Sequence, residues 1–233
     1  MRVSIVIPCY NEEETIGDVI EKTQNLETPY EKEIIVVDDG STDRSCMVVK
    51  RYREVRLVRH SSNRGKGETV RTGFKYATGE IVAIQDADME YMPEDLPRLA
   101  KPIIAGRADV VLGSRFLGRA EGMSLSHRLA NKFLSSIAGL LYHLKISDVM
   151  TGHKAFRTEA IHALDLRSSE FEIEAEIVAK AIAKGYRVSE VPINYRCREK
   201  GIAKINWRHG FRSVYVLLWI RLLNVFHREP FID

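Results

Sequence analysis

Short apolar runs rich in β-branched residues alternate with amphipathic stretches along the first half of the chain. The runs predict strands at Val3–Ile7, Glu33–Val37, Val55–Arg59, Ile81–Ile84 and Asp109–Leu112. The stretches between them predict helices at Glu12–Gln24, Asp43–Arg53, Lys66–Ala77 and Pro93–Ala105. Strands this short and apolar are buried on both faces, and the helices between them connect parallel neighbours. The pattern therefore predicts an α/β fold, a mostly parallel central sheet with helices on both faces.

The second half of the chain follows a less regular order. Its periodicity predicts two more strands, at Lys154–Arg157 and Tyr186–Val191. It also predicts three helices, at Leu125–Leu144, Glu172–Lys184 and Trp207–Phe226. Between Tyr195 and Trp207 the sequence is basic and carries few structural signals, so we expect a mobile loop there.

Charge is unevenly distributed along the chain. The net charge of the 233 residues is +3, which is too small to predict a nucleic-acid partner. From Tyr195 to Asp233, however, there are eight Lys and Arg against three Asp and Glu. Such a segment suits an anionic ligand or an anionic membrane surface, although a solvated helix face explains it equally well. The longest apolar run, Val214–Ile220, is far shorter than the ~20 residues of a membrane-spanning helix.

Cysteine usage indicates a reducing compartment. Cys9, Cys46 and Cys197 are odd in number and far apart, so they give neither a metal-ligand spacing nor a disulfide framework. Met1 leads directly into the first predicted strand, without the pattern of a secretory leader. We therefore expect a cytoplasmic protein.

Acidic residues follow three of the predicted strands. In a parallel sheet the carboxyl ends of the strands meet at one edge, where ligands bind. Asp86 and Asp88 follow the fourth strand two residues apart, so in extended backbone their carboxylates point to the same side. Glu90 continues this spacing. A lone Asp-x-Asp is most often a turn or a helix cap, but after a buried strand it predicts a Mg²⁺ or Mn²⁺ site.

Other strand ends carry further polar groups. Ser41–Asp43 suits the capping of the next helix, which leaves Asp39 free to bind a base or a ribose. Gly113-Ser114-Arg115 follows the fifth strand and adds a cation. Gly65-Lys66-Gly67 lacks the rest of a P-loop, and no G-x-G-x-x-G follows the first strand. Neither an ATPase nor a dehydrogenase is therefore predicted.

Four segments follow one another along the first half of the chain: Ile5-Val6-Ile7-Pro8-Cys9-Tyr10-Asn11-Glu12-Glu13, Val37-Asp38-Asp39-Gly40-Ser41-Thr42-Asp43, Asn63-Arg64-Gly65-Lys66-Gly67 and Asp86-Ala87-Asp88. Over about the first 160 residues they resemble the inverting GT-A glycosyltransferases of family 2. Three later segments are similar to the branch of dolichyl-phosphate mannose synthases and related polyprenyl-phosphate glycosyltransferases: Gly113-Ser114-Arg115, Asp148-Val149-Met150-Thr151-Gly152-His153-Lys154 and Glu190-Val191-Pro192-Ile193. The resemblance implies a Rossmann-like GT-A catalytic domain at 1–195, then a basic acceptor loop and a C-terminal amphipathic helix at 196–233.

The resemblance also implies roles for single residues, carried over by position. The nucleoside of a nucleotide-sugar would be held by Pro8, Tyr10, Glu12, Val37 and Asp39. The metal–diphosphate unit would be bound by Asp86 and Asp88, and Ala87 between them would also contact the nucleotide-sugar. Glu90, assigned to the metal from its spacing, stands where this branch often has glutamine. Phosphate oxygens would meet Arg115 and a second cation, Arg128 or Lys132. Lys204 would reach the acceptor phosphate or the donor. Arg128, Lys132 and, from the charge of the basic segment, Arg198 are further candidates for acceptor binding. Catalysis would rest on Asp88, Arg115 and Lys204.

A polyprenyl phosphate acceptor fits this charge pattern. Its second pKa is near ~6, so it is an oxyanion at neutral pH and needs cations rather than a general base. For Asp148 we favour holding Arg115 or His153 in place over acting as a base. Glu176 faces inward in the helical count and is a further candidate near the acceptor. Aromatic residues and arginines mixed along the last helix suit a membrane surface, although a core or dimer helix explains them as well.

Several alternatives stay open at this level. The acceptor is either a lipid phosphate or an alcohol such as a growing glycan. The donor is GDP-mannose, UDP-glucose or UDP-N-acetylglucosamine. A non-catalytic nucleotide-sugar-binding subunit of a membrane complex is a different class of function, which an intact acidic motif disfavours. A nucleotidyltransferase would show a glycine-rich basic loop after the first strand, and here that place is Pro8-Cys9-Tyr10-Asn11-Glu12. The favoured enzyme would work at the cytoplasmic face of a membrane, and a separate membrane-anchoring subunit is an alternative partner there.

Overall fold

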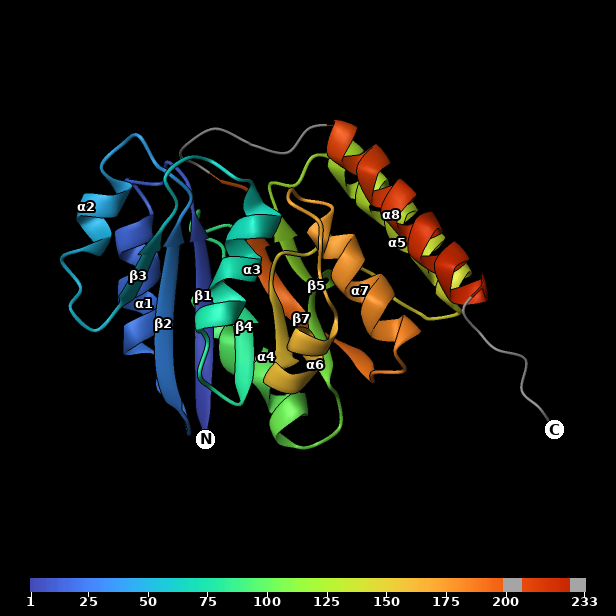
Figure 1. The fold of residues 1–233 in the computed structure, drawn as a ribbon, viewed down its shortest axis with the longest axis horizontal. Helices are drawn as coiled ribbons and strands as arrows, with labels where there is room; N and C mark the ends of the chain where they lie inside the picture. Colours follow the sequence, from blue (N-terminus) through green and yellow to red (C-terminus); the bar gives the residue numbers. More distant parts are fainter. Residues whose placement is uncertain (199–206, 227–233) are drawn as a thin grey trace.

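A computed structural model describes residues 1–198 and 207–226 of the chain. Its strands form one seven-stranded sheet in the order β3-β2-β1-β4-β6-β5-β7 (Figure 1). The strands are β1 (Arg2–Cys9), β2 (Glu31–Asp38), β3 (Arg56–Arg59), β4 (Ile81–Ile84), β5 (Val110–Glu121), β6 (Lys154–Arg157) and β7 (Val188–Arg196). Every expected strand is therefore present, and the α/β prediction is confirmed.

Six of the seven strands run in the same direction. β1 pairs in parallel with β2 and β4, and β2 pairs in parallel with β3. β6 is antiparallel to both β4 and β5, and β5 is again parallel to β7. The carboxyl ends of all strands except β6 therefore lie at one edge, which we call the carboxyl edge.

Helices cover both faces of the sheet, as predicted. They are α1 (Ile16–Asn25), α2 (Ser45–Val49), α3 (Lys66–Tyr76), α4 (Leu96–Ile104), α5 (Leu125–Tyr142), α6 (Thr158–Ala163), α7 (Ile173–Ala183) and α8 (Trp207–Phe226), with a short 3₁₀ turn at Pro93–Asp95. Along β1, Ile5 and Ile7 pack with α1, α2 and α4, while Val6 packs with α3, α6 and α7 on the opposite face. Successive side chains of the strand point to opposite faces of the sheet and therefore belong to two separate hydrophobic cores.

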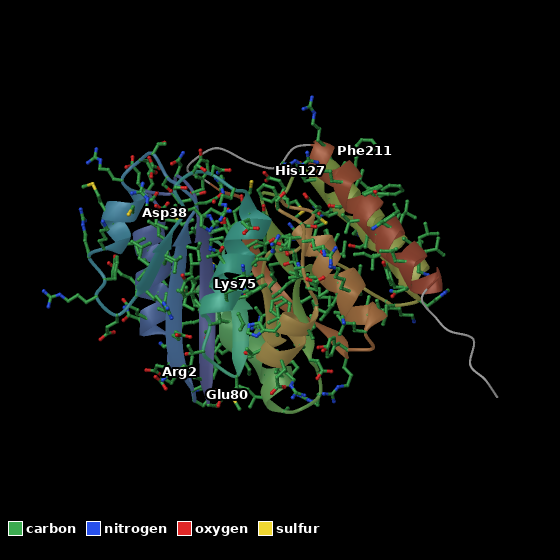
Figure 2. All side chains as sticks on the ribbon, viewed as in Figure 1. Arg2, Asp38, Lys75, Glu80, His127 and Phe211 are labelled. Carbon is green, nitrogen blue, oxygen red and sulfur yellow. The ribbon has the colours of Figure 1, made fainter. Side chains whose placement is uncertain are left out.

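The two edges of the sheet differ in what they carry. Figure 2 shows Asp38 at the upper, carboxyl edge, with His127 and Phe211 at the first turns of α5 and α8 on the same side. Arg2 and Glu80 mark the opposite edge. The segments that the sequence singled out therefore converge on one side of the molecule.

Some boundaries differ from the expectations. β5 continues to Glu121 past an irregularity between Ser114 and Arg119, because its second part pairs with an extended β7. The first helix begins at Ile16 rather than Glu12, since the preceding residues form a turn in which Thr15 Oγ1 donates to Ala87 O at 2.7 Å. The short helix α6 was not predicted from the sequence.

The last helix, α8, is present as predicted and packs on α5 and α7. Leu217 and Ile220 are buried, and the Tyr142 hydroxyl donates to Leu217 O at 2.8 Å. Other apolar side chains of α5 and α8 face solvent: Leu125, Leu129, Phe133, Leu140, Phe211, Tyr215, Leu218, Trp219, Leu222 and Leu223. None of the helices described has the length and apolarity needed to cross a bilayer.

Candidate active site

The Asp-x-Asp segment forms a turn directly after β4. The Asp88 Oδ1 atom accepts a hydrogen bond from Glu90 N at 3.0 Å, and Met89 adopts a positive φ of 59° inside the turn. The turn is tied to the end of β7, because Arg196 N donates to Glu90 O at 2.9 Å and the Tyr195 hydroxyl donates to Glu90 Oε2 at 2.9 Å. Residues far apart in the sequence therefore fix the orientation of the acidic turn.

Three carboxylates of this region converge on one guanidinium. Arg198 Nη2 lies 3.4 Å from Glu12 Oε1 and hydrogen-bonds to Asp88 Oδ2. Arg198 Nε lies 3.3 Å from Glu90 Oε1. We call these residues the Arg198 cluster. Glu12, predicted to hold the nucleoside, thus lies beside the predicted metal residues, as does Arg198, which was predicted for the acceptor.

Asp86 belongs to a second, more deeply buried group of charges. Lys66 Nζ lies 2.8 Å from Asp86 Oδ1 and 3.2 Å from Glu174 Oε1, and Glu174 is also paired with the fully buried Lys154. Gly152 allows this close packing, because a Cβ atom at this position would overlap Asp86 Oδ2. The position of Lys66 between two glycines drew attention to it in the sequence, but its partners could not be predicted there.

The two groups differ in how burial affects their charges. Burial, followed by the carboxylates of Asp86 and Glu90, raises the pKa of Asp88 to about 7, against the opposing effect of Arg198. Burial alone would lower the pKa of Lys66, but the carboxylates of Asp86 and Glu174 outweigh it and raise the pKa. The carboxylates are crowded enough that added positive charge at this edge is favourable.

Asp39 is placed differently from the expectation. Its carboxylate is not free, because Oδ1 accepts from Arg64 N at 2.9 Å and Oδ2 accepts from Gly65 N at 2.9 Å. A third contact is made by His60, whose Nδ1 atom lies 2.7 Å from Asp39 Oδ1. Asp39 therefore holds the loop before α3 in place, and its direct contact with a base or ribose stays a prediction. These hydrogen bonds could not be predicted from the residues around Asp39, because the donors, Arg64 N and Gly65 N, belong to a distant loop.

Arg115 is held by Asp148, as the favoured interpretation of Asp148 required. The Nε and Nη2 atoms of Arg115 each lie 2.7 Å from one oxygen of the Asp148 carboxylate. The guanidinium also lies 6.0 Å from the Tyr91 ring centre and 5.4 Å from that of Tyr195. Within the described residues, Nη1 of Arg115 has no hydrogen-bond partner. This leaves one fixed cationic donor for a ligand.

A second cation, Lys132, shares an aromatic neighbour with Arg115. The Phe116 ring centre is 5.9 Å from the Arg115 guanidinium carbon and 5.7 Å from Lys132 Nζ. Lys132 and Arg128 are both exposed on α5, and Lys132 is the one that shares an aromatic neighbour with Arg115. Lys204 lies outside the described residues.

Two further candidate residues, Glu176 and His153, have structural roles. The Glu176 carboxylate accepts from Arg167 N at 2.9 Å and from Ser168 N at 2.7 Å, so it anchors the loop before α7. His153 is fully buried, packs edge-on against Tyr91 with ring centres 5.6 Å apart, and has its pKa lowered by burial to about 4. His153 is thus a packed neutral side chain.

The donor set suits a cation that arrives with phosphate oxygens. Within the described residues, no three carboxylate, imidazole or thiolate side chains form a ready-made metal cage. Mg²⁺ commonly uses one or two carboxylates plus phosphates and water rather than an all-protein cage. Asp86 and Asp88, at the carboxyl edge beside Glu90, fit that mode of binding.

The fold and the site first define a class of protein. Acidic turns and fixed cations at the carboxyl edge of a parallel α/β sheet are suited to a phosphorylated ligand bound there. Residues 4–165 match the domain described as glycosyl transferase family 2. The chain belongs to this family and is a glycosyltransferase.

Named relatives align over most of the chain. It is 31% identical to a dolichol-phosphate mannosyltransferase of Pyrococcus furiosus, covering 94% of this chain and 64% of the relative. It is also 31% identical to a UDP-N-acetylglucosamine–dolichyl-phosphate N-acetylglucosaminyltransferase of Methanococcus voltae, covering 94% and 96% of the two chains. The fold resembles glucosyl-3-phosphoglycerate synthase from Mycobacterium tuberculosis, solved with Mn²⁺ and UDP-glucose, with a TM-score of 0.75, 21% identity, and coverage of 94% and 78%.

The Arg115–Asp148 pair makes a direct prediction. Asp148→Asn leaves the buried guanidinium without its carboxylate, so we expect the free energy of unfolding to fall by about 3–5 kcal/mol. Urea unfolding measures this loss. Asp165→Asn is the matched control, because Asp165 pairs with Arg167 at the surface, where the two side chains are 72% and 80% exposed, and its loss is expected to cost about 1 kcal/mol or less. Equal losses in the two variants would contradict this role for Asp148.

Proposed function

We propose that this glycosyltransferase moves a hexose, with inversion, from a nucleotide-diphosphate sugar to a polyprenyl phosphate, with Mg²⁺ or Mn²⁺. The observation that carries the proposal is the pairing at one edge of clustered carboxylates with Arg115, a fixed cation. The relatives' names support it, since they combine two different sugars, mannose and N-acetylglucosamine, with one class of lipid phosphate. Residues 1–195 would bind the donor, and 196–233 would serve the acceptor and the membrane.

The carboxyl edge would bind the donor through its diphosphate. Asp86 and Asp88, with Glu90 beside them, would hold the divalent cation that accompanies it. When bound, such an ion neutralises the charge that develops as the nucleoside diphosphate departs. Lys66 holds Asp86 from the buried side, which fixes the direction of this carboxylate before a ligand arrives. Pro8, Tyr10 and Val37 lie at the ends of β1 and β2, on the side proposed for the nucleoside.

Arg115 would supply a positive charge that needs no rearrangement. Asp148 and the surrounding rings fix its guanidinium, and Nη1 remains for a phosphate oxygen. Fixed charges aimed at a developing anion are among the strongest contributions to catalysis. Lys132, which shares the Phe116 ring with Arg115, would add a second cation for the acceptor or the leaving group.

The acceptor would need no general base. A lipid phosphate is already an oxyanion at neutral pH. Asp148, the one base candidate weighed from the sequence, has both oxygens engaged by Arg115. A polyprenyl phosphate therefore matches the residues better than an alcohol acceptor, which would require a positioned base.

The exposed apolar side chains of α5 and α8 would bring the enzyme to its lipid. Ten of the fifteen large exposed apolar residues in the described parts lie on these two helices. Both helices begin at the carboxyl edge, as the positions of His127 and Phe211 show in Figure 2. An apolar face next to a cationic site suits the cytoplasmic surface of a membrane, where apolar and basic groups bind together.

Donor turnover tests the proposed reaction. Nucleotide release from GDP-mannose, UDP-glucose and UDP-N-acetylglucosamine is measured with Mg²⁺ or Mn²⁺, with and without polyprenyl phosphate. We expect one donor to respond to the lipid, and both EDTA and Asp88→Asn to lower its turnover at least ~100-fold. Asp18→Asn, an exposed acid on α1, is the matched control and keeps full turnover. Metal-dependent nucleotide release that does not change when the lipid is added would refute the proposed polyprenyl phosphate acceptor. No nucleotide release with any donor would favour a non-catalytic subunit.

Vesicle sedimentation tests the membrane surface. With vesicles of phosphatidylglycerol and phosphatidylcholine, we expect Leu129→Ser/Trp219→Ser to bind several-fold more weakly than the unmodified chain, because two exposed apolar anchors are lost. Met47→Ser removes an equally exposed apolar residue on α2 and is expected to change nothing. Unchanged binding of the double variant would contradict the proposal, and no binding of any chain would favour a separate anchoring subunit.

A further inference from the structure

The Arg198 cluster brings one guanidinium to three carboxylates from two different turns. Glu12 comes from the turn after β1, and Asp88 and Glu90 come from the turn after β4. Only 10% of the Arg198 side chain is exposed, so solvent screens these ion pairs little. Arg198 is therefore a built-in counter-charge of the acidic turns and not a solvated surface residue.

The same carboxylates are the ones that the proposed function gives to the metal–diphosphate unit. Both oxygens of Asp88 are engaged, Oδ1 by Glu90 N and Oδ2 by Arg198. A guanidinium and a divalent cation both bind through carboxylate lone pairs, and two cations side by side repel each other. Arg198 and the cation therefore contend for the same oxygens.

We propose that Arg198 competes with the divalent cation for Asp88 and Glu90, so that metal binds strongly only together with the diphosphate of the donor. This inference rests on the proposed function. Lys66 stays on Asp86 from the buried side, whereas Arg198 lies at the end of β7, immediately before the segment predicted to reach the acceptor. Once the donor is bound, Arg198 gives up the carboxylates.

The displaced side chain keeps its charge for a second task. An arginine remains protonated in proteins, so leaving the carboxylates does not neutralise it. The sequence assigned Arg198 to the acceptor, and an acceptor phosphate would be its natural new partner. One arginine would then act in two successive steps. It first occupies the carboxylates of the metal site, and it binds the acceptor phosphate once the donor is in place.

Manganese binding to the donor-free chain tests the competition without any turnover. Free Mn²⁺ is followed by electron paramagnetic resonance as Mn²⁺ alone is added to the full chain. We expect Arg198→Gln to bind Mn²⁺ at least ~10-fold more tightly than the unmodified chain. Arg196→Gln loses the same charge two residues away, at a side chain that is 62% exposed and paired with Glu121, and is expected to bind as the unmodified chain does. Asp88→Asn should abolish the binding.

The outcomes separate this inference from the proposed function. If Arg198→Gln binds Mn²⁺ no more tightly than the unmodified chain while Asp88→Asn still abolishes binding, the competition is refuted and the metal site stands. If no variant binds Mn²⁺, even with GDP or UDP added, the metal site itself is refuted. Should Arg198→Gln fail to fold, Arg198→Lys decides the question. Its single ammonium group cannot bridge three carboxylates, so it too must bind Mn²⁺ more tightly than the unmodified chain.

Discussion

The repulsion among carboxylates at the carboxyl edge is the constraint on which the rest of the site depends. Asp86, Asp88, Glu90 and Glu12 lie close together, and so many negative charges persist only with cations among them. Lys66 supplies one from the buried side, and Arg198 supplies another from the end of β7. The crowding has a visible cost, because burial and its neighbours raise the pKa of Asp88 to about 7. A site held in this way favours an incoming cation, and hence a phosphorylated ligand.

The second half of the sheet brings positively charged side chains to the carboxylates of the first half. β6 enters antiparallel between β4 and β5, which places Gly152 and Lys154 next to Asp86 and Glu174. β7 then extends beside β5 as far as Arg196, so its end reaches the acidic turn after β4. Donor-side carboxylates and the cations expected to serve the acceptor thus meet at one edge. That meeting is what a transfer between two phosphorylated substrates requires.

Local signals in the sequence were enough for the strand order along the chain, the covered sheet and the residues at the strand ends. Apolar runs and acidic turns are read from neighbouring residues, so the places of Asp86, Asp88 and Arg115 at or after the strands were predicted without the structure. Pairings between distant segments leave no such trace. The partners of Lys66 and Arg198 were therefore missed, as were the backbone donors that bond the Asp39 carboxylate. The exposed apolar residues of α5 were missed too, because exposure depends on what packs against a helix and not on its own pattern.

The chemical identity of the product tests the central claim most directly. The full chain is incubated with the donor that turns over, once with a polyprenyl phosphate and once with the polyprenol of equal length, and lipid products are analysed by mass spectrometry. A fixed arginine that engages both oxygens of Asp148, the base candidate weighed from the sequence, predicts a lipid phosphate carrying one added hexose and no product from the polyprenol. Transfer to the polyprenol, or transfer only to a water-soluble glycan, would contradict the account.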